Sequence, residues 1–148
     1  MATIRIQGTD LEYQDKDVIN FDEGLIGMPH LRRMVLINYS EIDPFFLLCS
    51  LDDQQVNFLV LNACSHFNDY SPELTGEQRI QLGLSENETP LFFVTATIAP
   101  EWTDSTINLR APIVIAPGSM RGAQTVLTDS TYTLAEPLPF ACQEAAVG

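Results

Sequence analysis

Short runs of apolar residues, separated by turn-forming residues, follow one another along most of the chain. Residues 3–7 alternate between polar and apolar side chains, which is the period of a half-buried β-strand. A turn at 8–10 allows residues 11–13 to return as the second arm of a hairpin. Further strands are predicted at 18–21, 34–37, 45–49, 58–61, 91–98, 106–110, 113–116 and 125–127. Runs that are apolar at successive positions are buried on both faces, or they leave one face for a partner.

One segment has the pattern of a helix. Thr75 can cap its start, Gln78 three residues later can complete a capping box, and Gly83 can end it. About nine short strands with one short helix predict an all-β fold, a small compact β-barrel-like domain. We expect residues 1–140 to form this single domain and residues 141–148 to be a loose C-terminal tail.

The net charge of the chain argues against some classes of binding partner and favours others. Seven Lys and Arg residues stand against twenty Asp and Glu residues, a formal net charge of −13 over 148 residues. Such a surface repels phosphate backbones, so we expect no direct binding of nucleic acid. The same field attracts a basic protein and speeds its encounter, although acidity also serves simply to keep a protein soluble.

Cysteine usage and the absence of apolar spans indicate the compartment. Cys49, Cys64 and Cys142 are odd in number and lack paired spacing, and the first two lie in or beside apolar runs, where a free thiol packs as a small hydrophobe. This suits a reducing environment. The first residues lack the apolar stretch of a signal peptide, and no run is long enough to span a bilayer. We therefore expect a cytoplasmic protein without membrane contact.

The sequence contains few residues suited to catalysis. His30 and His66 lie far apart and match no metal-ligand spacing, and no phosphate-binding or nucleophile motif is present. The neighbouring acids Asp52 and Asp53 would point to opposite faces of a strand, and a solvated turn explains them better than a catalytic pair. We expect no enzymatic activity, no metal and no cofactor.

The order of several segments resembles the flagellar assembly factor FliW family. These segments are Phe-Asp-Glu-Gly-Leu-Ile-Gly at 21–27, Pro-Phe-Phe-Leu-Leu-Cys-Ser at 44–50, Asp-Tyr at 69–70 ahead of the helix, Asn-Leu-Arg-Ala-Pro-Ile-Val-Ile at 108–115, Arg-Gly-Ala-Gln-Thr-Val-Leu at 121–127, and 132–138. The resemblance covers roughly residues 3–138. The chain departs from the family pattern at Asn68, where a Pro is usual, at Ala116, where an Asn is usual, and at Ala135-Glu136, where a basic residue often stands. These departures concern loop shape and C-terminal contacts.

The resemblance implies a β-barrel-like fold and a regulatory role in motile bacteria. Proteins of this family bind flagellin in the cytoplasm and also bind CsrA, an RNA-binding translational regulator. Export of flagellin frees the factor to capture CsrA at a surface distinct from the RNA-contacting one, so that repression of flagellin synthesis is relieved allosterically. An acidic surface suits a basic regulator, and apolar aromatic segments suit a hydrophobic flagellin helix.

Candidate partner-binding residues follow from exposure and side-chain type. The two phenylalanines also fit the core, and each acid also fits a solvated turn. The candidates are Phe45, Phe46, Asp52, Asp53, Asp104, Asp129, Tyr132 and Leu134.

Two other functions compete with this one. A small-ligand-binding barrel of lipocalin type would need a hollow interior, against which the bulky apolar runs argue. A hydrolase would need a cluster of carboxylates in a cleft.

Overall fold

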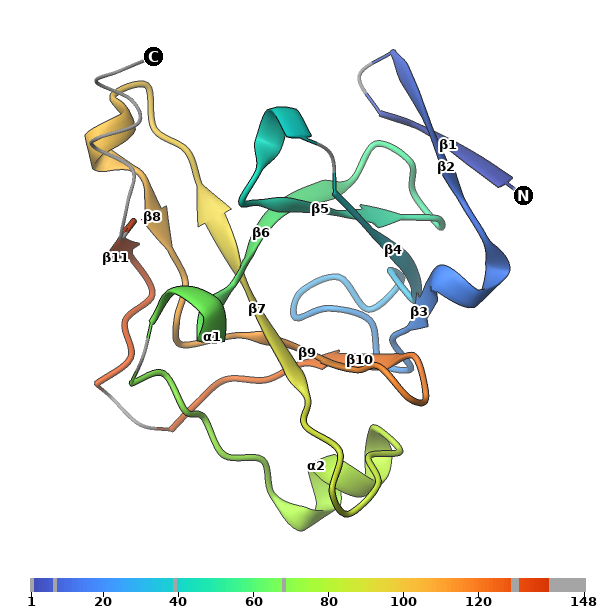
Figure 1. Cartoon of the computed structure of the whole chain (residues 1–148), viewed down its shortest axis with the longest axis vertical. Helices are drawn as coiled ribbons and strands as arrows, with labels where there is room; N and C mark the ends of the chain where they lie inside the picture. Colours follow the sequence, from blue (N-terminus) through green and yellow to red (C-terminus); the bar gives the residue numbers. More distant parts are fainter. Residues whose placement is uncertain (1, 7, 39, 68, 129–130, 139–148) are drawn as a thin grey trace.

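The computed structural model describes residues 2–6, 8–38, 40–67, 69–128 and 131–138 (Figure 1). The strands are β1 (Ala2–Ile6), β2 (Thr9–Tyr13), β3 (Val18–Asn20), β4 (Arg33–Ile37), β5 (Phe46–Ser50), β6 (Asn57–Asn62), β7 (Leu91–Thr97), β8 (Thr106–Ile107), β9 (Ile113–Ala116), β10 (Arg121–Gln124) and β11 (Glu136–Pro137). The helices are α1 (Ala63–His66) and α2 (Gly76–Gln81), with 3₁₀ turns at Asp15–Asp17, Ser40–Ile42 and Trp102–Asp104. The prediction of an all-β fold is confirmed.

Seven strands close into a barrel. Their order is β7–β6–β5–β4–β3–β10–β9, and β9 pairs again with β7. All of these pairs are antiparallel except β10 with β3, which is parallel and is joined through Arg121 and Asn20. In Figure 1, β8 and β11 extend the sheet beyond β7, while the β1–β2 hairpin lies on the other side, near β4 and β5. Closure of the barrel leaves these seven strands without a long free edge.

The barrel interior is filled by side chains that recur at every second position. On β4 and β5, Met34 and Leu48 point inward and are fully buried. The barrel core consists of Ile19, Phe21, Leu25, Leu31, Met34, Leu48, Val60, Phe93, Ile113 and Ile115. A small barrel has an interior just wide enough for side chains to fill, and these bulky residues occupy it.

The outward positions of the same strands are also buried, because other parts of the chain cover them. The hairpin cluster (Ile4, Val35, Leu47 and Cys49) forms where the β1–β2 hairpin covers the outer face of β4 and β5. The side cluster forms on the outer face of β6, β7 and β9, under α1 and the segments that follow β6 and β10. Its buried members are Phe45, Leu61, Ala63, Tyr70, Leu82, Phe92, Val94, Ile107, Leu109, Val114, Ala116, Leu127 and Leu138. The continuous apolar runs are therefore buried on both faces within one chain.

The helix α2 forms as its sequence predicts. The Thr75 hydroxyl accepts from the Gln78 amide at 3.1 Å, and the Gln78 side chain accepts from the Thr75 amide at 2.8 Å, which completes the capping box. Gly83 follows with φ of +66°, a conformation that ends a helix readily only at glycine.

Three predicted strand boundaries are wrong by two or more residues, and several others by one. The first hairpin turns before Thr9, which already pairs with Ile6. β8 ends at Ile107, because the Asn108 side chain accepts from the amides two and three residues further on and turns the chain. The strand predicted at 125–127 lies at 121–124 instead. Residues 125 and 127 follow this strand and still donate to the carbonyls of Pro112 and Arg110. The predicted tail at 141–148 lies outside the described residues.

Candidate functional site

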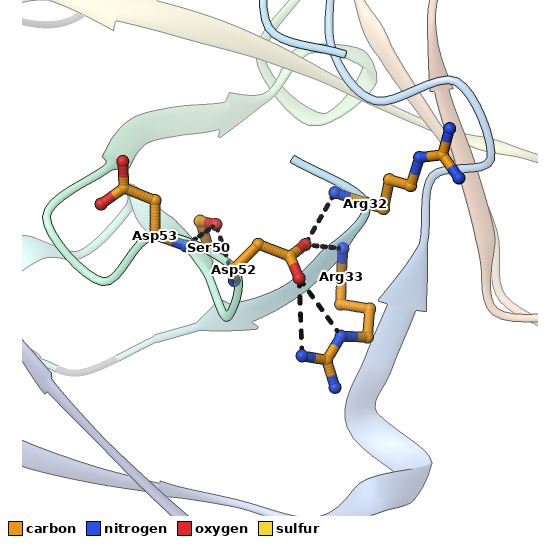
Figure 2. Close-up of polar contacts among 5 residues, drawn as sticks. All are labelled: Arg32, Arg33, Ser50, Asp52 and Asp53. Atoms are coloured by element: carbon orange, nitrogen blue, oxygen red, sulfur yellow. Dashed lines mark hydrogen bonds and ion pairs between the residues drawn. The ribbon is translucent and has the colours of Figure 1, made fainter. Parts of the chain in front are cut away.

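Asp52 holds the turn between β5 and β6 against the start of β4 (Figure 2). One carboxylate oxygen accepts from the backbone amides of Arg32 and Arg33, each at 2.8 Å. The other accepts from Nε and Nη2 of Arg33, each at 3.4 Å. In the same turn, the fully buried Ser50 Oγ accepts from the amides of Asp52 and Asp53 at 3.1 and 2.9 Å. The predicted turn is confirmed, and the carboxylate of Asp52 is occupied in shaping it.

This environment changes the acidity of Asp52. Its partial burial raises the pKa, but the hydrogen bonds from the Arg33 and Arg32 amides and the positive charge of Arg33 outweigh burial, so the pKa lies below its ordinary value. Asp53 has a more local role, because its Oδ1 accepts from the Gln55 amide at 3.1 Å. Neither acid is simply a free surface charge.

The two candidate phenylalanines belong to the packed interior. Phe45 is 5% exposed and lies in the side cluster. Phe46 is half-buried and packs edge-to-face on Phe93 in the barrel core, with ring centroids 5.5 Å apart. These adjacent rings therefore lie on opposite faces of the barrel wall, and neither is displayed as an aromatic surface. A partner contact by either residue remains a prediction.

The other candidates lie elsewhere. Asp104 ends the 3₁₀ turn before β8 and is exposed. Asp129 lies outside the described residues. Tyr132 is half-buried and Leu134 is 62% exposed, and both lie in the segment leading to β11. The structure brings Phe45 and Tyr132 into one cluster but does not gather the eight candidates on one surface.

Tyr132 separates two surface grooves. The α2 groove has a volume of about 410 Å³ and lies between residues 71–78 and residues 125–128. The β11 groove has a volume of about 300 Å³ and is lined by Phe67, Asp69, Tyr70, Leu109, Thr131 and Glu136. Tyr132 lines both grooves. Its hydroxyl accepts from the Ser71 amide at 3.3 Å, and its ring packs edge-to-face on Tyr70, with centroids 4.8 Å apart.

Tyr70 connects the groove residue Tyr132 to the side cluster. Its hydroxyl donates to the Leu109 carbonyl at 2.7 Å, inside the side cluster. Burial raises the pKa of Tyr70 well above its ordinary value, so the hydroxyl stays protonated and keeps donating. The ring of Tyr132 therefore packs against a side chain whose position is fixed by a buried hydrogen bond.

The sequence pattern does not identify the groove residues as a surface. It places Val126 within a strand, yet the Val126 side chain is 56% exposed beside the α2 groove. Ile80 on α2 is 78% exposed. The position of Ile80 can be predicted from the sequence, because the capping box sets where the helix begins and therefore on which face of the helix residue 80 lies.

In the described part of the chain, the histidines and cysteines that could act as bases, nucleophiles or metal ligands do not lie together. His30 is exposed after the 25–28 turn, whereas His66 is half-buried at the end of α1. Burial raises the pKa of the Cys49 thiol to about 11, and burial also raises that of Cys64. Cys64 is exposed by area, so the prediction that it packs like Cys49 is wrong. In the described ranges, no three His, Cys, Asp or Glu side chains gather where they could bind a metal ion.

No helix within the described residues is long and apolar enough to cross a bilayer. The filled barrel core also removes the hollow interior that a lipocalin-type ligand site would need. The grooves on the barrel exterior are therefore the better candidates for binding.

Comparison with known proteins identifies the family. The family model described as FliW protein matches residues 5–138. The chain is 33% identical over 128 residues to a flagellar assembly factor FliW of Clostridium tetani, covering 86% of this chain and 88% of the relative. It is 36% identical over 126 residues to a FliW of Thermotoga neapolitana, covering 84% and 85%. A crystal structure of the flagellar assembly factor FliW superposes with a TM-score of 0.83 at 28% identity, covering 92% of this chain and 96% of the other. The chain therefore belongs to the FliW family of flagellar assembly factors.

Proposed function

We propose that this protein binds flagellin in the cytoplasm and, when free of flagellin, binds and allosterically antagonises the translational regulator CsrA, thereby controlling flagellin synthesis. The observation that carries the proposal is the family match over residues 5–138. The names of the relatives describe an assembly factor, so we propose binding rather than catalysis as its activity.

The charge of the chain supports the regulator as a partner. A protein that binds RNA presents cations to phosphate groups. A partner with a net charge of −13 is complementary to such a protein and accelerates its approach. Since the antagonism is proposed to be allosteric, the acidic surface engages cations outside the RNA-contacting face.

The support for flagellin binding shifts from the aromatic runs to exposed aliphatic residues. The phenylalanines of β5 and β7 are packed in the interior and offer little surface. Ile80, Val126 and Leu134 are exposed on the segments around the α2 groove and β11. An amphipathic flagellin helix would place its apolar face on aliphatic residues of this kind.

A titration with all three proteins tests the switch. CsrA labelled with a fluorophore is bound to this protein, and flagellin is added while anisotropy is recorded. We expect flagellin to release CsrA or to weaken its affinity strongly, because one small domain has limited surface for two partners. A control protein of similar size and acidity, used in place of this protein, should not bind CsrA. The same control, added in place of flagellin, should not release CsrA from this protein. A stable ternary complex with unchanged affinities would contradict the switch and indicate a plain scaffold.

A further inference from the structure

The two grooves on either side of Tyr132 adjoin one another. The α2 groove reaches this ring from α2, and the β11 groove reaches it from β11. The hydrogen bond from the Ser71 amide to the Tyr132 hydroxyl joins the two walls at this point. At the far end of the α2 groove, Gln78 Nε2 donates to Thr125 Oγ1 at 3.0 Å. Residues of the segments 71–75 and 125–127 line the α2 groove together with these two hydrogen bonds.

The backbone beside the α2 groove has an unused edge. The amides of Thr125 and Leu127 donate to the carbonyls of Pro112 and Arg110 at 3.1 and 2.7 Å, continuing the β9–β10 ladder. In an extended chain, the amide and carbonyl of the residue between them point to the opposite side. That residue is Val126, whose N–H and C=O have no hydrogen-bond partner among the described residues. An extended peptide could pair with both groups.

The charges around both grooves have one sign. The charged side chains that line them in the described part of the chain are Glu73 in the α2 groove and Asp69 and Glu136 in the β11 groove. No arginine lines either groove among the described residues, and of the nearby ones Arg79 donates to the Ser85 and Glu88 carbonyls while Arg121 donates to the Gln81 carbonyl. The charged side chains that a ligand in the grooves meets are therefore all negative.

We propose that the two grooves together form a docking site for an extended, basic segment of a partner protein. The segment pairs through its backbone with Val126, places a small apolar side chain against Val126 and Tyr132, and directs Lys or Arg side chains to Glu73, Asp69 and Glu136. This goes beyond the proposed function, because it specifies a surface and the chemistry of its ligand whichever protein supplies the segment.

Charge distinguishes this occupant from the alternatives. A second copy of the chain would bring another net charge of −13 to an acidic surface. Residues 139–148 of the chain itself contain Glu144 and no Lys or Arg. Nucleic acid would bring phosphates to three carboxylates. A basic segment alone matches both the backbone edge and the charges.

Binding of short peptides to the full chain tests the proposal. The probe is the capped, fluorescent heptapeptide Thr-Lys-Val-Lys-Val-Lys-Thr, measured by anisotropy and by amide NMR on the labelled protein. We expect binding that weakens with salt and shifts the amide signals of Ser71 and Val126. A peptide with Glu in place of Lys should not bind. A peptide with Pro in place of Val keeps the charge but lacks two backbone donors, and it should bind about tenfold more weakly.

Protein variants locate the site. Tyr132→Ala should weaken binding of the probe about tenfold. Ile26→Ala removes an exposed aliphatic side chain that lines neither groove, and it should change nothing. The triple variant Asp69→Asn, Glu73→Gln and Glu136→Gln should weaken binding and reduce its salt dependence. The matched triple variant Glu12→Gln, Asp15→Asn and Glu101→Gln alters three exposed acids elsewhere and should bind normally. Thermal melting checks that each variant is folded.

Several results would overturn the proposal. These are no binding at millimolar peptide, amide shifts centred on another face, or equal weakening by the two triple variants, which would mean attraction to net charge alone. Concerted shifts of residues 139–148 with Val126 would assign the grooves to the chain's own tail instead.

Discussion

Some carboxylates in this protein accept hydrogen bonds from backbone amides in addition to contributing surface charge. Asp52 accepts from two amides at the start of β4. Glu88 accepts from the Gly118 amide at 2.7 Å and from the Ser85 amide at 3.2 Å, and these hydrogen bonds lower its pKa. Both acids stabilise turns, so replacing them alters local structure together with charge. Part of the acidity is therefore a requirement of folding.

Replacing Asp52 with asparagine should reduce stability in a pH-dependent way. The Asp52 carboxylate has a lowered pKa in the folded state, so its contribution is present above the unfolded pKa and is lost as pH falls through the folded pKa. We expect Asp52→Asn to lower the free energy of unfolding by about 1 kcal/mol at pH 7, discounted for a side chain that is 25% exposed. Urea unfolding from pH 7 to pH 2 should show the difference shrinking below about pH 4.

The control for this prediction is Asp15→Asn, in the exposed 3₁₀ turn after β2. It removes one negative charge without removing an acceptor of backbone amides, so its effect should stay within about 0.5 kcal/mol. An Asp52→Asn variant as stable as wild type at pH 7 would mean that the asparagine oxygen replaces the carboxylate fully.

At the scale of elements, the sequence predicts what local chemistry determines. The capping residues of α2 and the alternation at 3–7 are local signals, and α2 and β1 both form where they indicate, β1 at Ala2–Ile6. The sequence pattern misses β10, because Arg121–Gln124 contains no apolar run and becomes a strand by pairing with β9 and, at Arg121, with β3. α1 and β11 are too short to have a pattern of their own. Non-local pairing determines such elements.

The glycine of β10 illustrates this non-local control. A Cβ on Gly122 would lie 2.6 Å from the ring of Phe21, which is fully buried in the barrel core. We expect Gly122→Ala to lower the free energy of unfolding by about 1–3 kcal/mol, because the ring must move within a packed interior. Urea unfolding monitored by circular dichroism measures the change.

Gly76→Ala is the matched substitution for comparison. Gly76 begins α2, and a Cβ there would meet no atom within 4 Å. Alanine at this position should leave stability unchanged or raise it by up to about 1 kcal/mol, since it restricts the unfolded chain. Equal effects of the two substitutions would contradict the steric role of Phe21.

At the scale of the whole molecule, the surface is harder to predict than the fold. The bulky apolar runs lead correctly to a filled barrel. Exposure depends on which distant segments cover a strand, so Phe45 belongs to the core while Val126 lies on the surface. The role of an acid likewise depends on contacts across the chain, as the two amides that donate to Asp52 show. Tyr132 is the candidate that the structure places beside a groove.

The distribution of charge has a consequence for the proposed encounter with CsrA. If the net charge of −13 steers a basic regulator, association should slow as salt shortens the range of the field, which is about 8 Å at physiological ionic strength. Stopped-flow mixing from low salt to several hundred millimolar should show the association rate falling at least about tenfold. Flagellin, if it binds through aliphatic contacts, should be less sensitive to salt.

Charge reversal separates steering from contact. Asp104→Lys changes an exposed acid at the end of a 3₁₀ turn, so it should lower the association rate without disturbing the barrel. Asp52→Lys with Asp53→Lys is a poorer probe, because the first substitution also removes the acceptor for two amides. Removal of Val126, an aliphatic contact proposed for flagellin, should instead raise the rate at which flagellin dissociates. A CsrA association rate that does not change with salt would show that steering is absent, and the acidity would then serve only solubility and the turns that its carboxylates hold.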